Sequence, residues 1–351
     1  MAALASRLPK QVLRPQLSYI TKHKSKNMQI KLNRRRALAG LATLATVGAT
    51  SFEAVAQTAA PLRIGYQKSS TLMALLKVQG TLERSLAPLN VKLSWHEFSS
   101  GLPLLEALNL DNVDFSADVA DTVPVFAQAA GAKLTFVAQE APSPSAQAIV
   151  VRPDSPIQSV ADLKGKKVGF AKAAGAHYLL LAALEKNGLS LADIQPAYLT
   201  AADGRAAFEK GAIDAWVIWD PFLSAVQRQG GARVVVDGKG LASYQRYYLA
   251  SSRYAKVHAD VLQVIYAELS KVGRWVKQNP QDAAALLAPV WGLDAQTIVQ
   301  ANSRRSYEVR PVVANGLAEQ QKIADAFLAE KLLPRKVQAL NVDLFQPGAV
   351  S

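Results

Sequence analysis

The side chains that most often perform catalysis or bind metals are sparse in this chain. The four histidines, His23, His96, His177 and His258, are scattered, and no two have the spacing of metal ligands. The chain has no cysteine, which excludes thiol nucleophiles, thiolate metal ligands and disulfides. It also has no P-loop and no G-x-S-x-G motif. We therefore predict no catalytic residues, no metal and no cofactor.

Two short segments carry weaker signs of chemistry, and each has a simpler explanation. Gly238-Lys239-Gly240 follows a predicted strand, as in a dinucleotide-binding loop, but Ser243 stands where the third glycine belongs. We interpret it as a turn. Asp118 and Asp121 could act as paired acids, yet their spacing before an apolar helix is more typical of a helix cap with acidic support.

Three segments of small residues are better candidates for a ligand site, because each joins a predicted strand to a predicted helix. They are residues 69–71, 99–101 and 173–177. Helix starts favour anions, and ligands of open α/β sheets bind at the carboxyl ends of strands. Lys68 and Lys172 lie only at the edges of these segments. We therefore expect an anion held mainly by N–H groups, hydroxyls and helix dipoles, without an arginine clamp.

Regular alternation of strands and helices would position these segments. Predicted helices begin near residues 70 and 101, span 119–130 and 176–187, and dominate the chain beyond residue 254. In that last region one apolar stripe is interpreted as core; it comprises Val261, Ile265, Leu269, Val272 and Val276. Such alternation predicts parallel β-structure built from βαβ units. The predicted strands are 62–66, 91–97, 113–116, 134–138, 147–151, 167–170, 197–199, 215–218, 233–236 and 246–250.

The net charge of +13 is concentrated at the N-terminus and does not indicate a nucleic-acid binder. Ten of the 40 Lys and Arg residues, but only one of the 27 acids, fall in residues 1–56. The rest of the chain is therefore close to neutral. It offers no evident basic surface for a polyanion.

Residues 1–56 have the features of a removable signal peptide. The basic run 34–36 precedes an apolar run, 37–49, that is too short to span a hydrocarbon core of about 30 Å. Ala54-Val55-Ala56 is a small-x-small cleavage site. The arginine pair indicates the twin-arginine route, whereas the missing aromatic residue leaves the general secretory route open. Met28 offers a second start, for a signal of ordinary length.

Nine segments spread along residues 61–345 together resemble one known family. They are 62–69, 95–98, 105–109, 124–131, 155–157, 160–168, 193–196, 203–208 and 214–221. Such a long collinear match is more specific than any single motif. The family that these segments resemble is the aliphatic-sulfonate-binding proteins, the periplasmic receptors of ABC importers of the nitrate, sulfonate and taurine type.

The resemblance implies an α/β fold of the type II periplasmic-binding-protein class. Two lobes, each a mainly parallel sheet flanked by helices, would be joined by two crossings. The Pro/Ser-rich segment 141–145 is the first candidate crossing. Lobe one would comprise residues 61–145 and 246–351, and lobe two residues 146–245. The resemblance also implies a periplasmic monomer that captures an alkanesulfonate or similar small organic anion for an inner-membrane ABC permease, without nucleic acid or cofactor.

The resemblance places the ligand contacts on both sides of the cleft. The N–H groups of Ala176 and His177 would lie at a helix start, and a protonated His177 could aid an anion, although a structural hydrogen bond would suit it equally. Trp219 would either contact the organic tail of the ligand or pack between the lobes. Asp220 would either line the cleft or cap a helix. The full set of candidates is Gln67, Ser69, Ser70, Thr122, Ala176, His177, Trp219, Asp220 and Tyr247.

The chain departs from the pattern of this family at two places in the expected cleft. Residues 173–176 lack the serines expected before His177, and Asp118 adds a negative charge where small residues are expected. Both departures leave the identity of the anion open. The alternatives are a receptor for nitrate, taurine or aromatic sulfonates, and a same-fold enzyme of the desulfinase or thiamine-precursor synthase type. Enzymes with a cysteine nucleophile are excluded.

The predicted signal peptide gives the first testable expectation. We expect the exported protein to lack residues 1–56 or 1–60, because cleavage should follow Ala56 or Ala60. N-terminal sequencing of protein recovered from the periplasm measures this directly. A soluble periplasmic form that still carries residue 30 or earlier would contradict the expectation.

Overall fold

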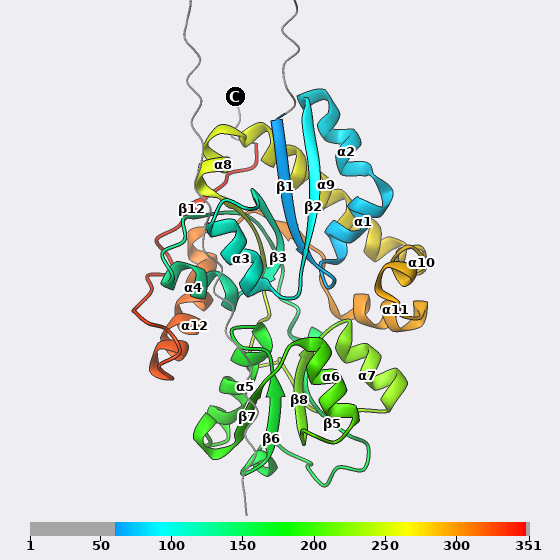
Figure 1. Ribbon diagram of the computed structural model, residues 1–351, viewed down its shortest axis with the longest axis vertical. Helices are drawn as coiled ribbons and strands as arrows, with labels where there is room; N and C mark the ends of the chain where they lie inside the picture. The colour runs from blue at the N-terminus through cyan, green and yellow to red at the C-terminus, as the bar shows by residue number, and fades with distance from the viewer. Residues whose placement is uncertain (1–59, 349–351) are drawn as a thin grey trace, which may run out of the picture. The chain divides into compact units, whose positions relative to one another are not determined.

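The structure is a computed structural model that describes residues 60–348, which belong to one compact unit. The predicted signal peptide, residues 1–56, lies outside the described residues. The described chain folds around two β-sheets, which Figure 1 shows one above the other, each with helices packed on it. We call each sheet with its helices a lobe.

The first sheet has seven strands in the order β11-β4-β10-β3-β1-β2, with β12 also paired to β4. Strand β1 is parallel to β2 and β3, so their carboxyl ends meet at one edge, whereas β10 is antiparallel to β3 and β4. The strands are β1 (Ala60–Gln67), β2 (Val91–Phe98), β3 (Phe115–Ala120), β4 (Leu134–Glu140), β10 (Arg246–Ser251), β11 (Val309–Arg310) and β12 (Asp343–Leu344).

The second sheet has five strands in the order β7-β6-β8-β5-β9. Strand β6 is parallel to β7 and β8, and β5 is antiparallel to β8 and β9. The chain passes between the sheets twice, after β4 and after β9. The strands are β5 (Gln147–Val151), β6 (Lys167–Phe170), β7 (Gln195–Tyr198), β8 (Ala215–Trp219) and β9 (Arg233–Asp237).

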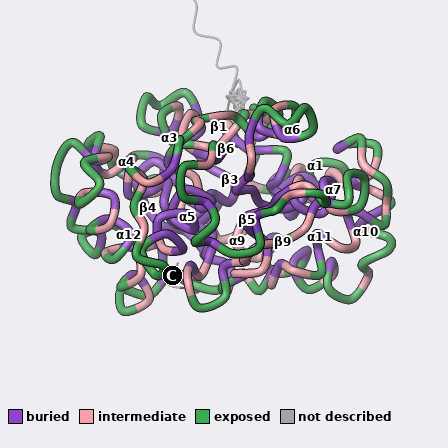
Figure 2. The backbone as a smooth tube through the Cα atoms, turned by 90° about the horizontal axis from the view of Figure 1, so that it is seen from below, coloured by how far each residue is buried: buried purple, intermediate pink, exposed green. Residues whose placement is uncertain are grey.

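The helices follow the strands and cover the sheets. Figure 2 shows the strands running through the buried interior, with exposed segments at the periphery. The helices are α1 (Thr71–Gln79), α2 (Thr81–Leu86), α3 (Gly101–Asn109), α4 (Thr122–Ala129), α5 (Gly175–Lys186), α6 (Ala201–Glu209), α7 (Phe222–Gly230), α8 (Ser252–Val257), α9 (Ala259–Gln278), α10 (Pro280–Trp291), α11 (Ala295–Arg304) and α12 (Ala318–Ala329).

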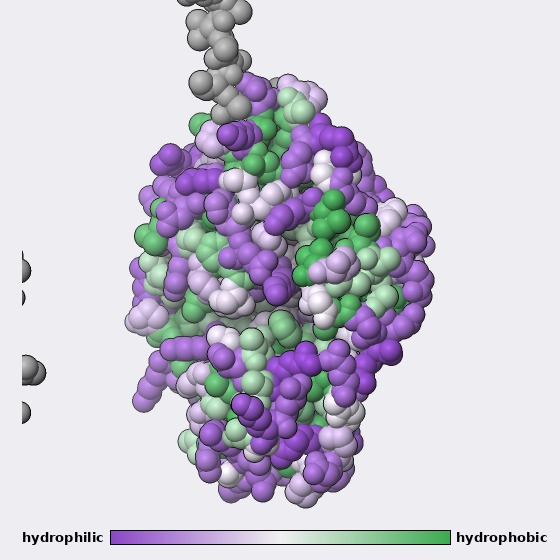
Figure 3. Space-filling view, turned by 45° about the vertical axis from the view of Figure 1, so that its right-hand side comes forward, coloured by the Kyte–Doolittle hydropathy of each residue, from purple (hydrophilic) through white to green (hydrophobic). Residues whose placement is uncertain are grey.

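Two hydrophobic clusters form the core. One lies between the first sheet and helices α1, α2, α9 and α10, and the other continues from α3, α4 and α12 into the second sheet. The predicted apolar stripe of α9 is confirmed as core, because Val261, Ile265 and Leu269 are each at most 1% exposed. Between residues 60 and 348, no helix combines the length and hydrophobicity needed to cross a bilayer. Figure 3 shows a largely hydrophilic face with separate apolar patches.

The boundary around Asp118 differs from the prediction. We expected a helix from residue 119, but β3 continues to Ala120 and α4 begins at Thr122. Asp118 therefore lies within a strand and cannot cap a helix. Asp121 precedes α4, but its side chain accepts a hydrogen bond from the N–H of Gln245 at 2.9 Å instead of capping. The cap interpretation of both aspartates was wrong, because strand pairing extends β3 beyond the apolar pattern.

A buried group of four charges joins the strands at the centre of the first sheet. Asp118, Glu140, Arg246 and Arg305 are each at most 3% exposed. Arg246 pairs with Asp118, and Arg305 contacts Asp118 at 3.2 Å and Glu140 at 2.6 Å. Burial alone would lower the pKa of Arg305, but Glu140 and the other nearby anionic groups raise it well above its usual value. Two cations and two carboxylates therefore balance one another.

We predict that this charge balance is required for stability. Arg305→Met should lower the free energy of unfolding by about 3–5 kcal/mol, because it leaves a buried carboxylate without its cation. Adding Glu140→Gln should recover much of the loss, since Arg246 and Asp118 then remain a balanced pair. Urea unfolding at pH 7 measures both variants.

Arg310→Met is the matched control, because it removes an ion pair with Glu308 in which both side chains are more than half exposed. Arg310→Met should lower the free energy of unfolding by less than about 1 kcal/mol. The explanation fails if the losses from Arg305→Met and Glu140→Gln simply add in the double variant.

Candidate ligand-binding site

Two adjoining pockets lie between the lobes at the carboxyl ends of the strands. They share Gln67, the last residue of β1, and Trp219, the last residue of β8. The inner pocket is narrow, with a cavity volume of about 20 Å³, and the outer pocket is larger, at about 230 Å³. The inner pocket is lined by Gln67, Ser100, Gly101, Leu102, Ala120, Val123, Lys172, Ala173, Ala174, Gly175, Trp219, Tyr244 and Arg246.

Two helix N-termini, one from each lobe, open onto the inner pocket. Gly101 is the first residue of α3, and Gly175 is the first residue of α5. A Cβ atom at Gly101 would lie 2.9 Å from Val123, and one at Gly175 would lie 2.7 Å from the Tyr244 ring. Only glycine therefore allows this close approach. The first N–H groups of a helix lack intrahelical partners and carry the positive end of its dipole, which suits an anion.

Two cationic side chains also line the inner pocket: Lys172, which the sequence placed at the edge of a junction, and Arg246, which was not among the candidates. Arg246 donates hydrogen bonds from Nη1 to the Tyr244 hydroxyl at 2.8 Å and from Nη2 to the Asp118 carbonyl at 3.0 Å. Lys172 precedes the start of α5. Arg246 was overlooked because it lies on the strand after the second crossing, far in sequence from the three junctions.

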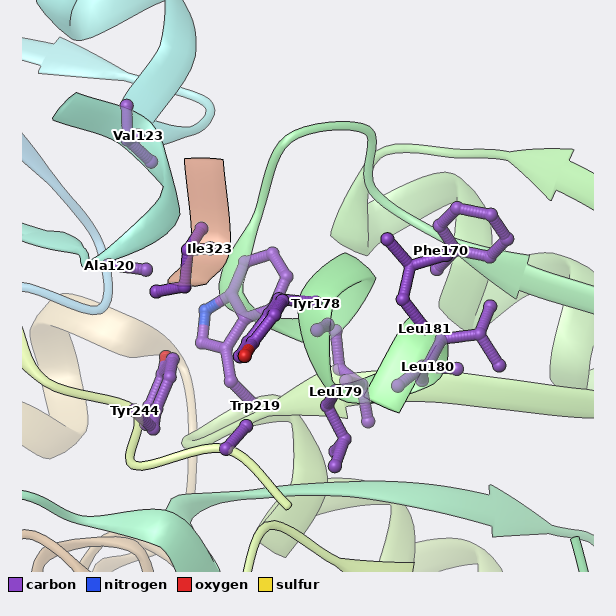
Figure 4. Packing of buried hydrophobic residues seen from close by; sticks show 14 of the residues in the cluster. Ala120, Val123, Phe170, Tyr178, Leu179, Leu180, Leu181, Trp219, Tyr244 and Ile323 are labelled. Carbon is purple, nitrogen blue, oxygen red and sulfur yellow. The ribbon is translucent and has the colours of Figure 1, made fainter. Parts of the chain in front are cut away.

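Three of the predicted site residues line the pockets. Gln67 and Trp219 line both, and Ser69 lines the outer one. The Gln67 side chain donates a hydrogen bond to the Asp118 carbonyl at 3.2 Å. Figure 4 shows the Trp219 indole extending toward the side of Ile323 and Ala120, so that it stands between elements of both lobes.

Three further predicted residues lie within the walls of the site and do not line either pocket. Ser70 is fully buried, and its hydroxyl accepts the N–H of Gln67 at 3.2 Å. Thr122 donates its hydroxyl hydrogen to the carbonyl of Ala173 at 2.6 Å, which joins the two lobes directly. Ala176 is fully buried as the second residue of α5.

His177 does not act as a cation here. Burial, aided by Lys172, lowers its pKa to about 4, so the imidazole is neutral at neutral pH. Its Nδ1 accepts the N–H of Ala173 at 3.2 Å, and its ring lies 5.0 Å from that of Phe327 on α12. The expected alternative of a structural hydrogen bond is therefore the one observed.

Asp220 and Tyr247 are buried outside both pockets. Asp220 accepts hydrogen bonds from the N–H of Ser224 at 2.9 Å and its hydroxyl at 2.6 Å, at the start of α7. Burial raises the pKa of Asp220 to about 6. Tyr247 packs in the core with its ring 5.1 Å from Phe136, and burial raises its pKa. Of the two expected roles for Asp220, the helix cap is the one observed.

Several lining residues were not on the list of candidates. Ser100 and Gly101 belong to a junction that the sequence did single out, so this signal was available. Tyr244 and Arg246 gave no sequence signal, because their position depends on how β10 pairs with β3 and β4. Among residues 60–348, no three His, Asp or Glu side chains are grouped as a metal site.

Sequence comparisons find a matching family and related bacterial proteins. A family model described as NMT1/THI5 like matches residues 91–283. An aliphatic sulfonates-binding protein of Escherichia coli (strain K12) is 43% identical over 314 residues, covering 89% of this chain and 95% of the relative. One from Bacillus subtilis (strain 168) is 29% identical, covering 80% of this chain and 85% of the relative.

Solved structures agree with this result. The periplasmic aliphatic sulphonate binding protein SsuA from Escherichia coli matches with 43% identity and a TM-score of 0.75, covering 82% of this chain and 98% of that one. The alkanesulfonate-binding protein SsuA from Xanthomonas axonopodis pv. citri, bound to MOPS, matches with 40% identity and a TM-score of 0.76, covering 80% and 97%. The desulfurization enzyme DSZB, at 18% identity, shares only the fold.

These matches confirm the predicted two-lobed α/β fold, with its two sheets and two crossings. They also place the chain among binding proteins and not among the enzymes of this fold. On both sequence and structure, the chain belongs to the NMT1/THI5-like family and, within it, to the aliphatic sulfonate-binding proteins.

Proposed function

We propose that this protein is the periplasmic substrate-binding component of an ABC importer and captures alkanesulfonates or similar small organic anions. The observation that carries the proposal is the convergence of two helix N-termini and Arg246 on one inter-lobe pocket. The SsuA relatives, named for binding aliphatic sulfonates or alkanesulfonates, support the choice of ligand. The captured anion would then pass to a permease in the inner membrane.

The charges around the inner pocket suit a singly charged anion. Arg246 is already paired with Asp118, and the four buried charges behind the pocket balance one another. The remaining positive potential comes from the ends of α3 and α5 and from Lys172. Each helix end is equivalent to roughly half an elementary charge. The two helix ends together are therefore equivalent to about one elementary charge, which matches a sulfonate monoanion.

The walls of the outer pocket suit an organic tail. Phe98 and Phe222 line it together with Trp219, whose ring lies 6.1 Å from that of Phe222 in an edge-to-face arrangement. Apolar rings of this kind favour alkyl groups because they remove apolar surface from water. The sulfonate would therefore lie in the inner pocket and its tail would point toward Trp219 and the outer pocket.

Capture would require movement of the two lobes. We assign residues 61–145 and 246–351 to lobe one and residues 146–245 to lobe two. The segments near 141–147 and 243–248 would act as the hinge, because the chain passes between the sheets there. Contacts between the lobes, such as that of Thr122 with Ala173, describe a closed arrangement. The receptor would bind its ligand when open and close around it as a monomer.

We predict that Ser100 contributes directly to anion binding. Ser100→Ala should weaken binding of ethanesulfonate by about tenfold or more, because a hydrogen bond to a charged group contributes roughly 1.5–3 kcal/mol. Ser100→Asp should be worse, since it sets a carboxylate against the sulfonate. Calorimetric titration measures both. Ser94→Ala, in the middle of β2 and outside both pockets, is the control. Equal affinity of all three variants and the parent would exclude this helix start.

Hinge closure gives a separate prediction. Saturating ethanesulfonate should reduce the radius of gyration measured by small-angle X-ray scattering, because the ligand binds residues of both lobes and stabilises the compact arrangement. Sulfate at the same ionic strength controls for salt effects. An unchanged radius of gyration, with binding established by calorimetry, would argue against closure.

A further inference from the structure

Arg304, the last residue of α11, reaches from lobe one to lobe two without lining either pocket. Its Nη1 atom donates hydrogen bonds to both carboxylate oxygens of Asp220 at 3.2 Å and to the Ser224 hydroxyl at 3.1 Å. Its Nη2 atom donates to the side-chain oxygen of Gln227 at 2.5 Å. All three partners belong to lobe two, and Figure 1 shows α11 beside α7.

Asp220 links this contact to the wall of the pocket. It follows Trp219, which lines both pockets and pairs in register with Gln147 in the second sheet. The N–H of Asp220 donates to the carbonyl of Ala146 at 2.9 Å, at the first crossing between lobes. A side chain that fixes the position of Asp220 therefore also fixes Trp219 in the pocket wall and the segment at the first crossing between the lobes.

The contact can form only while the lobes are close together. Opening would separate α11 from α7 and return Arg304 and Asp220 to water, where both charges are well hydrated. Asp220 is 4% exposed in the closed arrangement, so its carboxylate depends on Arg304 for an opposite charge. The pair therefore stabilises the closed arrangement selectively, and an exposed surface pair would do so far less.

We propose that Arg304 is a positioning residue for ligand capture, which holds Asp220 and thereby Trp219 in place when the lobes close. This inference rests on the proposed receptor function, and it adds a residue that never touches the ligand. A residue that acts only on closure changes how fast the ligand leaves. It leaves association unchanged, because the ligand enters the open arrangement.

Arg304→Gln tests the inference in protein purified from the periplasm. Stopped-flow measurements with ethanesulfonate should show dissociation about tenfold faster and association within about twofold of the parent. Arg304→Lys should restore part of the effect, since it keeps the charge but loses the forked geometry. Arg228→Gln is the matched control, because it removes a half-exposed pair between the same two helices, with Asp294 at 3.7 Å. This control should match the parent.

A distance measurement separates this inference from the proposed function. The chain has no native cysteine, so Glu106→Cys and Lys210→Cys place one spin label on each lobe. Double electron–electron resonance should show a smaller closed population in Arg304→Gln than in the parent. Parent-like distances and parent-like dissociation in Arg304→Gln would overturn the role of Arg304. A parent that binds no alkanesulfonate would overturn the proposed function, while the distances would still test Arg304.

Discussion

The pairing of Asp118 and Glu140 with Arg246 and Arg305 is the constraint on which the rest of the molecule depends. It ties β3, β4 and β10 to the end of α11 in a region that excludes water. The same pairing positions part of the wall of the inner pocket, because Arg246 lines that pocket. It also fixes the position of Arg304, the neighbour of Arg305, which extends to the opposite lobe. Stability, the ligand site and the contact between lobes are therefore parts of one arrangement.

This arrangement would let the proposed site attract an anion without leaving a free buried cation. A guanidinium with no partner would be costly to bury, and Asp118 removes that cost by pairing with Arg246. For the proposed anion, the attraction that remains comes from Lys172 and from the starts of α3 and α5, whose fixed dipoles need no counterion. Asp118, which in the sequence added a negative charge to the expected cleft, pairs with Arg246 and holds it in position.

Local pattern predicted most of the strands, the buried stripe of α9 and the three junctions at strand ends. The three junctions all reach the pockets, through Ser69, Ser99 and Ser100, and residues 173–175. What local pattern could not predict depends on pairing between distant segments. Arg246 enters the site only because β10 lies antiparallel between β3 and β4, and the short strands β11 and β12 form only against β4. Likewise, the burial that keeps His177 neutral comes in part from Phe327, 150 residues further along the chain.

The central claim is that an alkanesulfonate binds with its head between the starts of α3 and α5. A crystal structure with 2-bromoethanesulfonate tests this most directly, because anomalous scattering from bromine locates the tail of the ligand. We expect the sulfonate beside Gly101, Gly175 and Arg246, and the bromine toward Trp219 and the outer pocket. A bromine peak elsewhere, such as in the pocket that Tyr178 and Glu185 of α5 form with Asp325 of α12, would contradict the account if the inner pocket were unoccupied.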